Sequence, residues 1–450
     1  MPKKKTALTI EERLQQALVP AEEQPYEVPE NWVWVRLESV ASWGSGGTPS
    51  RKHEEYYNGD ILWIKTGELN NGWIYDTEEK ITDEGLKKSS AKLFPPYSVL
   101  IAMYGATIGK VAILGVPATT NQACACAVCN QSLLYMYLFY YCISQKNVFI
   151  EKGKGGAQPN ISQIILKQHP IPLPPLSEQQ RIVERIEELF AKLDETKERL
   201  QEVADSFAVR KAAILHKAFT GELTKQWRRE NGVSDESWKE KKLGEICTIG
   251  SGGTPSRKHE EYYNGNIPWV KTGELNHDWI YDTEEKITEA GMNNSSARLF
   301  PVNTVIVAMY GATIGKTAIL AVPATTNQAC ACFVCKAGLI YNYLYWYFIS
   351  QKENLIKSSK GGAQPNISQT ILKQYYISLP TIPEQHEIVR LIDDLLARER
   401  AAQQAAEQAL ASIDLMKKSI LARAFRGELG TNKASEASAL ELLRQVLAEN

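Results

Sequence analysis

A long internal repeat constrains the fold of this chain more than any other feature of its sequence. Gly44–His53 returns as Gly250–His259, at an offset of 206 residues. Between 44–128 and 250–334, 66 of 85 positions are identical, without a gap. The same offset relates two further pairs of segments, 154–162 with 360–368 and 218–223 with 424–429. A unit of about 200 residues is far longer than a solenoid repeat, so the sequence predicts a duplicated pair of domains.

Each repeat unit divides into a globular part and a long helix. The globular part contains apolar runs flanked by Gly, Pro and Asn, which predict strands at 61–64, 98–104 and 110–114. An aromatic-rich stretch at 133–144 favours a helix. We therefore predict an α+β fold, with two duplicated α/β domains separated by two long antiparallel coiled-coil helices in a pseudo-twofold arrangement.

The long helices are predicted from their starting signals and their apolar periodicity. Ser177 with Gln180, after the proline-rich 170–175, has the spacing of a capping box, and Thr381 with Glu384 begins the second helix. Spacings of three and four, typical of a coiled-coil seam, join Ile186, Leu189, Leu193, Thr196, Leu200, Val203, Phe207 and Ile214, with Arg210 as the one misfit. The second seam is Ile392, Leu395, Glu399, Ala402, Ala406, Ala409, Ile413, Met416 and Ile420. Each helix would run about 40 residues, or about 60 Å.

These patterns divide the chain into six predicted segments. They are an N-terminal arm (1–30), a first domain (31–170), a central spacer helix (171–225), a second domain (226–376), a C-terminal spacer helix (377–430) and a short C-terminal helix (431–450). The amphipathic stretches Leu8–Leu18 and Ala437–Leu447 could pack near one another, which would support a closed arrangement.

Composition excludes several classes of protein. Hydrophobic residues make up 44% and charged residues 23%, as in ordinary soluble globular proteins. There is no run of eighteen apolar residues for a membrane span and no apolar segment of a signal peptide near the start. The eight cysteines lie mostly in apolar runs, so we expect a reduced, cytoplasmic protein. A net charge of −1 argues against strong DNA binding by the chain alone, but fits a subunit whose partners supply further contacts.

Several motifs resemble chemical sites, but their spacing favours structural roles. Gly105–Lys110 has three residues between its glycines where a phosphate-binding loop has four, so a turn between strands is favoured. Cys124, Cys126 and Cys129 lack a fourth ligand at zinc spacing and are expected to be buried strand residues. Gly44–Gly47 favours a turn over a phosphate cradle. Phe94–Tyr97 lacks the polar first residue of the methyltransferase Asp/Asn-Pro-Pro-Tyr signature.

Candidate DNA contacts are selected by chemistry and by identity between the copies. Arg and Lys suit guanine edges or phosphates, whereas Asn and Gln suit adenine. Copies that read the same bases should share their reading residues, although a recent duplication also preserves others. The shared set is Arg51, Lys52, Lys65, Thr66, Asn70, Tyr104, Thr107, Lys110, Asn121 and Gln122, repeated as Arg257, Lys258, Lys271, Thr272, Asn276, Tyr310, Thr313, Lys316, Asn327 and Gln328. Lys87–Lys88 is replaced by Asn293–Asn294, so this pair is not expected to read bases.

A series of motifs in a fixed order resembles the specificity subunit of Type I restriction–modification systems. They are Trp32–Leu37 followed by Gly46–Ser50, the Gly-Gly-Ala-Gln-Pro-Asn-Ile-Ser at 155–162 and 361–368, the Pro-Leu-Pro-Pro-Leu-Ser-Glu-Gln-Gln-Arg-Ile-Val at 172–183, and the Phe-Thr-Gly-Glu-Leu at 219–223, echoed at 425–429 with Arg426 in place of Thr. The opening segments at 17–20 and 29–34 resemble the family as well. Each motif alone is weak, but together they span nearly the whole chain.

The resemblance implies a non-catalytic subunit with two target recognition domains. Each would read one half of a split site in double-stranded DNA, and the long helices would set the spacing and bind two methyltransferase subunits. S-adenosylmethionine, ATP and Mg would belong to the partners, including restriction subunits, with no cofactor or metal on this chain. Because the two domains are near-copies, whereas family members usually carry two different ones, we expect an inverted-repeat site; a tandem arrangement would give a direct repeat.

Two alternatives remain open on sequence grounds. One is a coiled-coil scaffold that carries two protein- or ligand-binding domains. The other is a DNA-binding regulator without methyltransferase partners. Neither explains the alternation of two domains with two long helices as simply.

Overall fold

The computed structural model describes residues 9–153, 159–276, 278–359 and 366–449. Half of the motif at 155–162 and most of its copy at 361–368 therefore lie outside the described residues, as does Leu8 of the predicted N-terminal helix. The chain forms two compact units. Unit 1 comprises residues 1–199 and 409–450, and unit 2 comprises residues 200–408.

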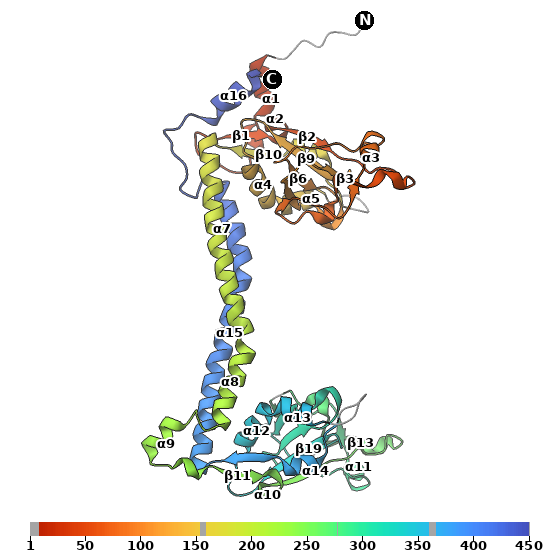
Figure 1. The fold of residues 1–450 in the computed structure, drawn as a ribbon, viewed down its shortest axis with the longest axis vertical. Coiled ribbons are helices and arrows are strands. Elements are labelled where there is room, and N and C mark those ends of the chain that lie inside the picture. Colours follow the sequence, from red (N-terminus) through yellow and green to blue (C-terminus); the bar gives the residue numbers. More distant parts are fainter. Residues whose placement is uncertain (1–8, 154–158, 277, 360–365, 450) are drawn as a thin grey trace. The chain divides into compact units, whose positions relative to one another are not determined.

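The globular part of unit 1 is built on three small sheets (Figure 1). The largest has the order β2-β9-β6-β7-β4, formed by β2 (Ala41–Ser45), β9 (Cys124–Cys129), β6 (Val99–Ala102), β7 (Val111–Leu114) and β4 (Trp73–Ile74). The second has the order β5-β3-β8, formed by β5 (Lys80–Ile81), β3 (Tyr57–Ile64) and β8 (Thr119–Thr120). The third pairs β1 (Val33–Arg36) with β10 (Pro170–Leu173). The helices are α2 (Leu37–Val40), α3 (Asp83–Lys87), α4 (Tyr135–Ser144), α5 (Lys146–Lys152) and α6 (Gln163–Lys167).

The five-stranded sheet of unit 1 is apolar on both faces. Val99 and Ile101 of β6 are fully buried in a core shared with α4, whereas Leu100 and Ala102 point into a second core with Ile64. This alternation is the period of two that a strand imposes on its side chains. A strand buried on both faces needs a continuous apolar run, which is why the Val99–Ala102 run forms the centre of the sheet.

Unit 2 repeats this architecture strand for strand, which confirms the predicted duplication of an α/β domain. Its sheets have the orders β12-β19-β16-β17-β14, β15-β13-β18 and β11-β20. The strands are β11 (Lys239–Lys242), β12 (Cys247–Ser251), β13 (Tyr263–Val270), β14 (Trp279–Ile280), β15 (Lys286–Ile287), β16 (Val305–Ala308), β17 (Thr317–Leu320), β18 (Thr325–Thr326), β19 (Cys330–Cys335) and β20 (Tyr376–Leu379). The helices are α9 (Lys225–Asn231), α10 (Leu243–Ile246), α11 (Glu289–Asn293), α12 (Tyr341–Ser350), α13 (Lys352–Ser358) and α14 (Gln369–Gln374).

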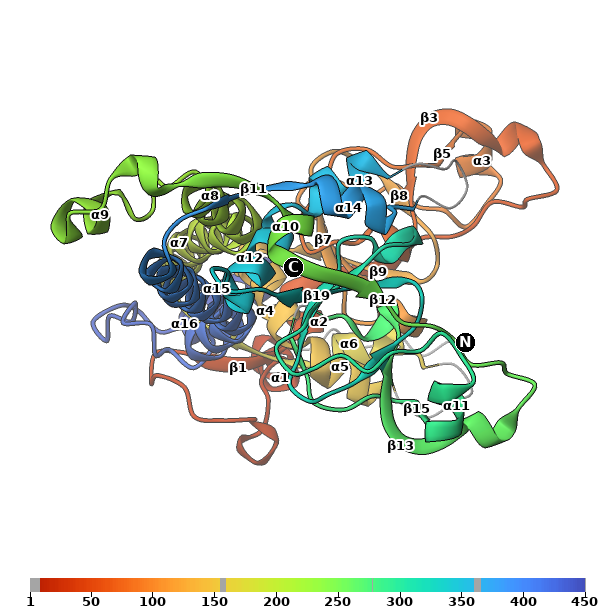
Figure 2. The same ribbon diagram turned by 90° about the horizontal axis from the view of Figure 1, so that it is seen from below.

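The predicted long helices are present as α7 (Leu176–Asp205) with α8 (Phe207–Phe219), and as α15 (Ile382–Ala424). The first is interrupted at Ser206, whereas α15 is continuous over 43 residues. Within each unit the helix segments lie side by side and run antiparallel, α7 with the end of α15 in unit 1 and α8 with the start of α15 in unit 2 (Figures 1 and 2). In unit 1 Asp194 pairs with Lys417, and in unit 2 Arg210 pairs with Glu399 while Thr224 contacts Glu384.

The predicted coiled-coil seam is only partly buried. Ile186, Ile392, Ala406 and Ile413 are buried, but Val203 and Met416 are 39% and 48% exposed. The reason is that the start of each helix packs on the globular core of its own unit, as well as on the other helix. Ile182 and Ile186 lie in the core of unit 1, and Ile388 and Ile392 lie in that of unit 2. The buried face follows this contact and departs from a strict heptad.

The predicted capping boxes at the helix starts are wrong. Helix α7 begins at Leu176, so Ser177 lies inside it, and the Gln180 amide donates to Glu184. Glu384 does not return to the backbone at the start of α15. Its carboxylate is fully buried and accepts from Thr224 and Trp238 in unit 2.

The chain ends meet within unit 1, as the amphipathic patterns predicted. Helix α1 (Ile10–Ala17) packs against α16 (Ala439–Glu449). An Arg13 guanidinium nitrogen donates to the Leu447 carbonyl at 3.2 Å, and Leu14 and Leu443 are buried in the same core. None of the described helices has both the length and the apolar composition needed to cross a bilayer.

Candidate DNA-reading surface

The candidate DNA contacts of unit 1 gather where several strands end at one edge of the globular part. Lys65 follows the last residue of β3 and Asn121 follows the last residue of β8. These strands pair in parallel, so their carboxyl ends lie together. Tyr104 follows β6, whose Ala102 pairs with Cys124 just after Gln122. None of the ten candidates is buried, so all of them are accessible to a ligand.

Arg51 and Lys65 are brought together by one acidic residue that the sequence reasoning missed. A guanidinium nitrogen of Arg51 lies 2.7 Å from a Glu79 carboxylate oxygen, and the Lys65 Nζ lies 2.9 Å from the other. This ion pair lowers the pKa of Glu79 and raises the pKa of Lys65. Both groups are therefore charged at neutral pH, and Glu79 orients two cations toward the same surface.

Aromatic rings hold the Arg51 side chain from its other side. Its guanidinium carbon lies 4.3 Å from the ring centre of Tyr57 and 5.2 Å from that of Trp63. The Trp63 indole nitrogen donates to the Gly47 carbonyl at 2.9 Å, which connects the ring to the loop that carries Arg51. Cation–π contact and ion pairing thus preorganise this arginine, and a fixed guanidinium suits bidentate contact with a guanine edge or a phosphate.

The glycine-rich loop before Arg51 is required for close packing. A Cβ atom on Gly46 would lie 1.8 Å from the Thr120 carbonyl oxygen, and one on Gly47 would lie 2.1 Å from the Ser90 hydroxyl. The loop therefore lies directly against β8 and cannot carry side chains at these positions. The turn predicted at Gly44–Gly47 is wrong for its first half, because Gly44 and Ser45 are the last residues of β2, and only Gly46 and Gly47 belong to the loop.

The Gly105–Lys110 motif is a turn between β6 and β7, as predicted. A single 3-10 turn, η4 (Gly105–Thr107), connects the two antiparallel strands, and Gly105 and Gly109 have positive φ. Tyr104 is 45% exposed at the start of this turn, and the Thr107 hydroxyl donates to the Tyr104 carbonyl at 2.8 Å. The turn therefore presents Tyr104 and Lys110 at the same edge as Lys65 and Asn121.

The polar side chains between these cations are partly committed to the fold. The Asn121 side-chain oxygen accepts from the Ala123 amide, which leaves its amide nitrogen for a ligand. The Thr48 hydroxyl donates to the Gln122 side-chain oxygen at 2.5 Å, so the Gln122 amide nitrogen also remains available. Asn70 is exposed just before Asn71, whose side chain accepts from the Val111 amide beside Lys110.

Unit 2 repeats this surface in detail. Arg257 and Lys271 both pair with Glu285, at 2.7 and 3.0 Å, and Arg257 stacks on Tyr263 and Trp269. The Thr254 hydroxyl again donates to the side chain of Gln328, and that of Thr313 to the Tyr310 carbonyl. The remaining candidates of unit 2 are also accessible: Lys258, Thr272, Asn276, Lys316 and Asn327, of which the first two correspond to Lys52 and Thr66 of unit 1. Each unit thus presents an equivalent set of donors. The missed Glu79 could have been found in the sequence, because Glu285 repeats it at the offset of 206 residues.

The three cysteines of β9 are strand residues, as predicted, but only two of them are fully buried. Cys124 and Cys126 are fully buried on one face of β9, and Cys129 at its end is partly exposed. Burial raises the pKa of the Cys124 thiol to about 12, so this thiol stays protonated and unreactive at neutral pH. Within the described residues, no group of three or more His, Cys, Asp and Glu side chains has the arrangement of a metal site.

Sequence comparison places this fold among DNA specificity proteins. A family model, the Type I restriction modification DNA specificity domain, matches residues 29–205 and again residues 235–409. The chain is 25% identical over 452 residues to the Type I restriction enzyme EcoKI specificity subunit of Escherichia coli K12, covering 94% of this chain and 96% of that protein. It is 24% identical over 395 residues to the MjaIX specificity subunit of Methanocaldococcus jannaschii, covering 83% and 88% of the two chains.

Solved structures share the fold over most of the chain. The HsdS subunit from Thermoanaerobacter tengcongensis matches with a TM-score of 0.66 and 21% identity, covering 90% of this chain and all of that one. A second structure, described in terms of complex assembly and conformational transition of the type I R-M system, matches with a TM-score of 0.63 and the same coverage.

Proposed function

Because this chain belongs to the Type I restriction–modification DNA specificity family, we propose that it selects the DNA site at which its partner subunits act. Like its relatives it is a specificity subunit, the non-catalytic component of such a system. The observation that carries the proposal is the repeated surface around Arg51 and Arg257, where accessible cations, amides and a tyrosine lie together in both units. We assign base and phosphate contacts to these residues.

Each unit would read one half of a split site in double-stranded DNA. The ten candidates match between the copies, and so do the carboxylates that orient them, so we propose that both half-sites contain the same bases. Within each unit the helix segments run antiparallel, and an antiparallel pair looks the same from either end. This supports an inverted repeat with an unread spacer.

Mapping of methylated adenines by single-molecule sequencing tests this proposal in a host that carries the complete system. The expected result is one bipartite motif whose two ends are reverse complements. Unrelated half-sites, or the same half-site repeated in the same orientation, would contradict the inverted repeat.

Arg51→Ala and Arg257→Ala test the surface itself. Loss of a bidentate arginine contact costs about 1–3 kcal/mol of discrimination, so each variant should weaken specific DNA binding by about 10- to 100-fold at one half-site. The measurement is equilibrium binding by the assembled complex at fixed salt. Lys87→Asn is the matched control, because Asn293 occupies that position in unit 2, and it should leave affinity unchanged. Equal affinity of the arginine variants and the control would reject the surface.

Two methyltransferase subunits are the proposed partners, with restriction subunits joining for cleavage. The near-neutral net charge supports this, because a chain with a charge of −1 gains little from phosphate neutralisation alone. S-adenosylmethionine, ATP and Mg would be held by the partners. We expect the chain to co-purify with two methyltransferase subunits. Tight, specific DNA binding by the isolated chain would instead favour a regulator. A chain that shows neither co-purification nor DNA binding would favour a scaffold.

A further inference from the structure

A ten-residue run beside the DNA-reading surface is identical in the two units. Residues 73–82 return unchanged at 279–288, and in unit 1 they form β4, β5 and the connection between these strands. Exposed charges just beyond the run have diverged, with Ala290, Asn293 and Asn294 in place of Glu84, Lys87 and Lys88. The copies have therefore lost exposed charges that neither unit needs, so the charges kept within the run need a physical explanation.

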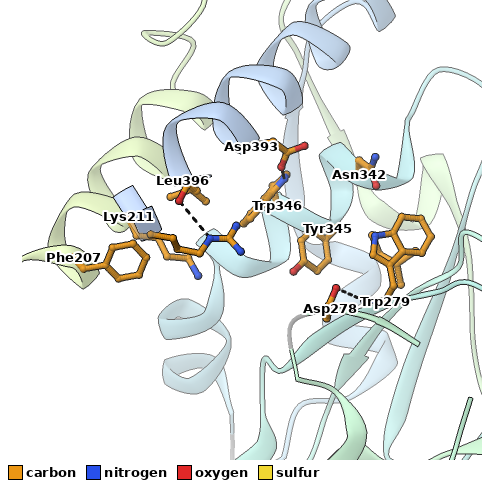
Figure 3. A pocket seen from close by; sticks show the side chains of 11 residues that line it. Phe207, Lys211, Asp278, Trp279, Asn342, Tyr345, Trp346, Asp393 and Leu396 are labelled. Carbon is orange, nitrogen blue, oxygen red and sulfur yellow. Dashed lines mark hydrogen bonds between the residues drawn. The ribbon is translucent and has the colours of Figure 1, made fainter. Parts of the chain in front are cut away.

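The apolar residues of the run have a structural role. Trp279 lines a pocket of unit 2 together with Tyr345 of α12 (Figure 3), and its ring centre lies 5.8 Å from that of Tyr341. Ile280 and Ile287 are buried. These contacts explain why the run keeps its apolar residues, but they do not explain its carboxylates.

Two of the three carboxylates in the run are neutralised within the unit. Asp76 forms an ion pair of 3.0 Å with Lys80. Glu79 pairs with both Arg51 and Lys65, as described above. Unit 2 repeats both arrangements. These two negative charges therefore stabilise the local fold and orient the cations of the surface.

Glu78 is the third carboxylate, and its side chain remains accessible to a ligand. It is 79% exposed, and a carboxylate oxygen lies 3.5 Å from the Lys65 Nζ. In unit 2 the equivalent Glu284 is 78% exposed and lies 3.3 Å from the Lys271 Nζ. These distances are long for a hydrogen bond, and an exposed ion pair contributes little to stability. Stability of the fold therefore does not account for this glutamate.

A carboxylate beside Lys65 is unfavourable for phosphate binding but suitable for reading a base. DNA phosphates repel it, so it opposes the contribution that the cations make to affinity. A glutamate contributes to DNA recognition where it accepts a hydrogen bond in the major groove, above all from the N4 amino group of cytosine. Glu78 is therefore expected to face the edges of the bases and not the backbone.

Lys65 and Glu78 together match the major-groove edge of a G·C pair. Guanine O6 accepts and cytosine N4 donates, and these two atoms lie side by side because they pair with each other. The Lys65 ammonium and the Glu78 carboxylate also lie side by side, with the opposite polarity. An A·T pair likewise places an acceptor beside a donor, but thymine carries a methyl group next to its acceptor, where guanine has the second acceptor N7. A cation at this position therefore favours guanine.

We propose that Glu78 and Glu284 each read the cytosine of a G·C pair in their half-site, while Lys65 and Lys271 donate to the guanine. This inference rests on the proposed function and adds a base assignment to it. The carboxylate also selects against other sequences, because it would have no donor where it faces thymine O4 or guanine O6. DNA without the site is disfavoured as well, since there the carboxylate meets only phosphate charge.

Equilibrium binding by the assembled complex tests the proposal on duplexes in which each base pair of the methylated motif is changed singly. The wild-type complex should lose about tenfold in affinity or more when the G·C pair read by Glu78 is replaced. Glu78→Ala should remove this penalty at that pair, and Glu284→Ala should remove it at the equivalent pair of the other half-site. Glu84→Ala is the matched control and should keep full discrimination, because it removes the same charge at an exposed position where unit 2 carries Ala290.

A modified base tests the contact at the level of one atom. N4-methylcytosine at the same pair replaces the amino hydrogen that faces the major groove. It should weaken wild-type binding by about tenfold and leave binding by Glu78→Ala unchanged. Full discrimination by Glu78→Ala at every pair would overturn the proposal, and relaxation at an A·T pair alone would overturn the assignment to cytosine. A complex that prefers no duplex over any other would instead overturn the proposed function on which this inference depends.

Discussion

The starts of the two long helices carry equivalent buried carboxylates but differ in the groups that donate hydrogen bonds to them. Glu178 in unit 1 and Glu384 in unit 2 are fully buried at equivalent positions, and each accepts from an indole nitrogen, that of Trp32 or Trp238. Glu384 also forms an ion pair of 2.6 Å with Arg228. Among the described residues, Glu178 accepts instead from an amide and a hydroxyl group, both of which are uncharged.

The donors come from the segment that follows the end of the other long helix. In unit 2, Thr224 and Arg228 follow α8, whereas in unit 1 Thr431 and Asn432 follow α15. Each unit therefore uses the returning chain to satisfy a buried glutamate. The difference shows that the fold requires an acceptor at this position and a chain segment that supplies donors, but not a particular charge on that segment.

The largest effect is expected from Arg228→Met. It leaves Glu384 buried without its charged partner, and breaking a buried pair in this way costs about 3–5 kcal/mol. Hydrogen exchange of peptides from each unit, followed by mass spectrometry, should show loss of protection in residues 200–408. Arg229→Met, at the exposed arginine next to Arg228 in α9, should change protection little. Equal effects of the two variants would show that the ion pair is not needed.

A smaller effect is expected from Asn432→Ala in unit 1. The Asn432 amide donates to Glu178 and to Asn31, both at 2.8 Å. Its removal leaves a buried acceptor with one donor fewer, which costs about 1–3 kcal/mol. The loss should appear in peptides of residues 9–199 and 409–449. A loss as large as that of Arg228→Met would contradict the distinction between charged and neutral donors.

The pH dependence of stability should separate the two glutamates further. Burial raises the pKa of Glu178, so the folded state binds its proton more tightly than the unfolded state. Its contribution to stability is greatest below the unfolded pKa, and falls as the pH rises from there through the folded value. Glu178→Gln should remove this dependence and change the stability of unit 1 at neutral pH by less than about 1 kcal/mol.

Glu384→Gln is the matched comparison for this pH experiment. It leaves Arg228 buried without a negative partner, so it should destabilise unit 2 by about 3–5 kcal/mol at neutral pH. Chemical denaturation followed across pH 4 to 8, a range that begins near the ordinary glutamate pKa of about 4.3 and extends above it, measures both variants. A Glu178→Gln protein that keeps the wild-type pH profile would contradict the assignment.

The smallest effect concerns one turn of the five-stranded sheet. Tyr97 has φ of 69°, a left-handed conformation that costs a bulky residue about 1–2 kcal/mol, and Asn303 occupies that position in unit 2 with φ of 62°. The Tyr97 ring stacks near Tyr135, with centres 4.9 Å apart, which offsets part of the cost. Tyr97→Asn should therefore shift the free energy of unfolding by less than about 1 kcal/mol. A larger loss would show that the aromatic cluster outweighs the backbone strain.

Sequence reasoning predicted the elements that depend on local pattern. The Val99–Ala102 and Val111–Leu114 runs form central strands because continuous apolar residues suit a strand buried on both faces. The shared face of Cys124 and Cys126 in β9 was predictable because alternate residues of a strand point to the same side of the sheet. The repeat located the second domain without further information, since an identical local pattern gives an identical local structure.

Features that depend on residues far apart in the chain were not predictable in the same way. Glu79 lies 28 positions from Arg51, and its role appears only when β3 and β5 pair. The sequence pattern assigned Glu384 to a capping box because it cannot show that Arg228 reaches the same carboxylate. The seam was wrong at Val203 and Met416 for a similar reason, because helix periodicity does not reveal which faces the globular part covers.

The way unit 1 is assembled from two parts of the chain has a consequence for biosynthesis. Unit 2 is contiguous, so all of its residues are available once position 408 has emerged from the ribosome. Unit 1 needs residues 409–449 to cover Glu178 and to supply Phe425 and Leu443 to its core. The first domain synthesised is therefore the last one completed, and until then it exposes apolar surface that chaperones recognise and that promotes aggregation. Translation that terminates soon after position 408 would release a chain in which only the second domain has its full core.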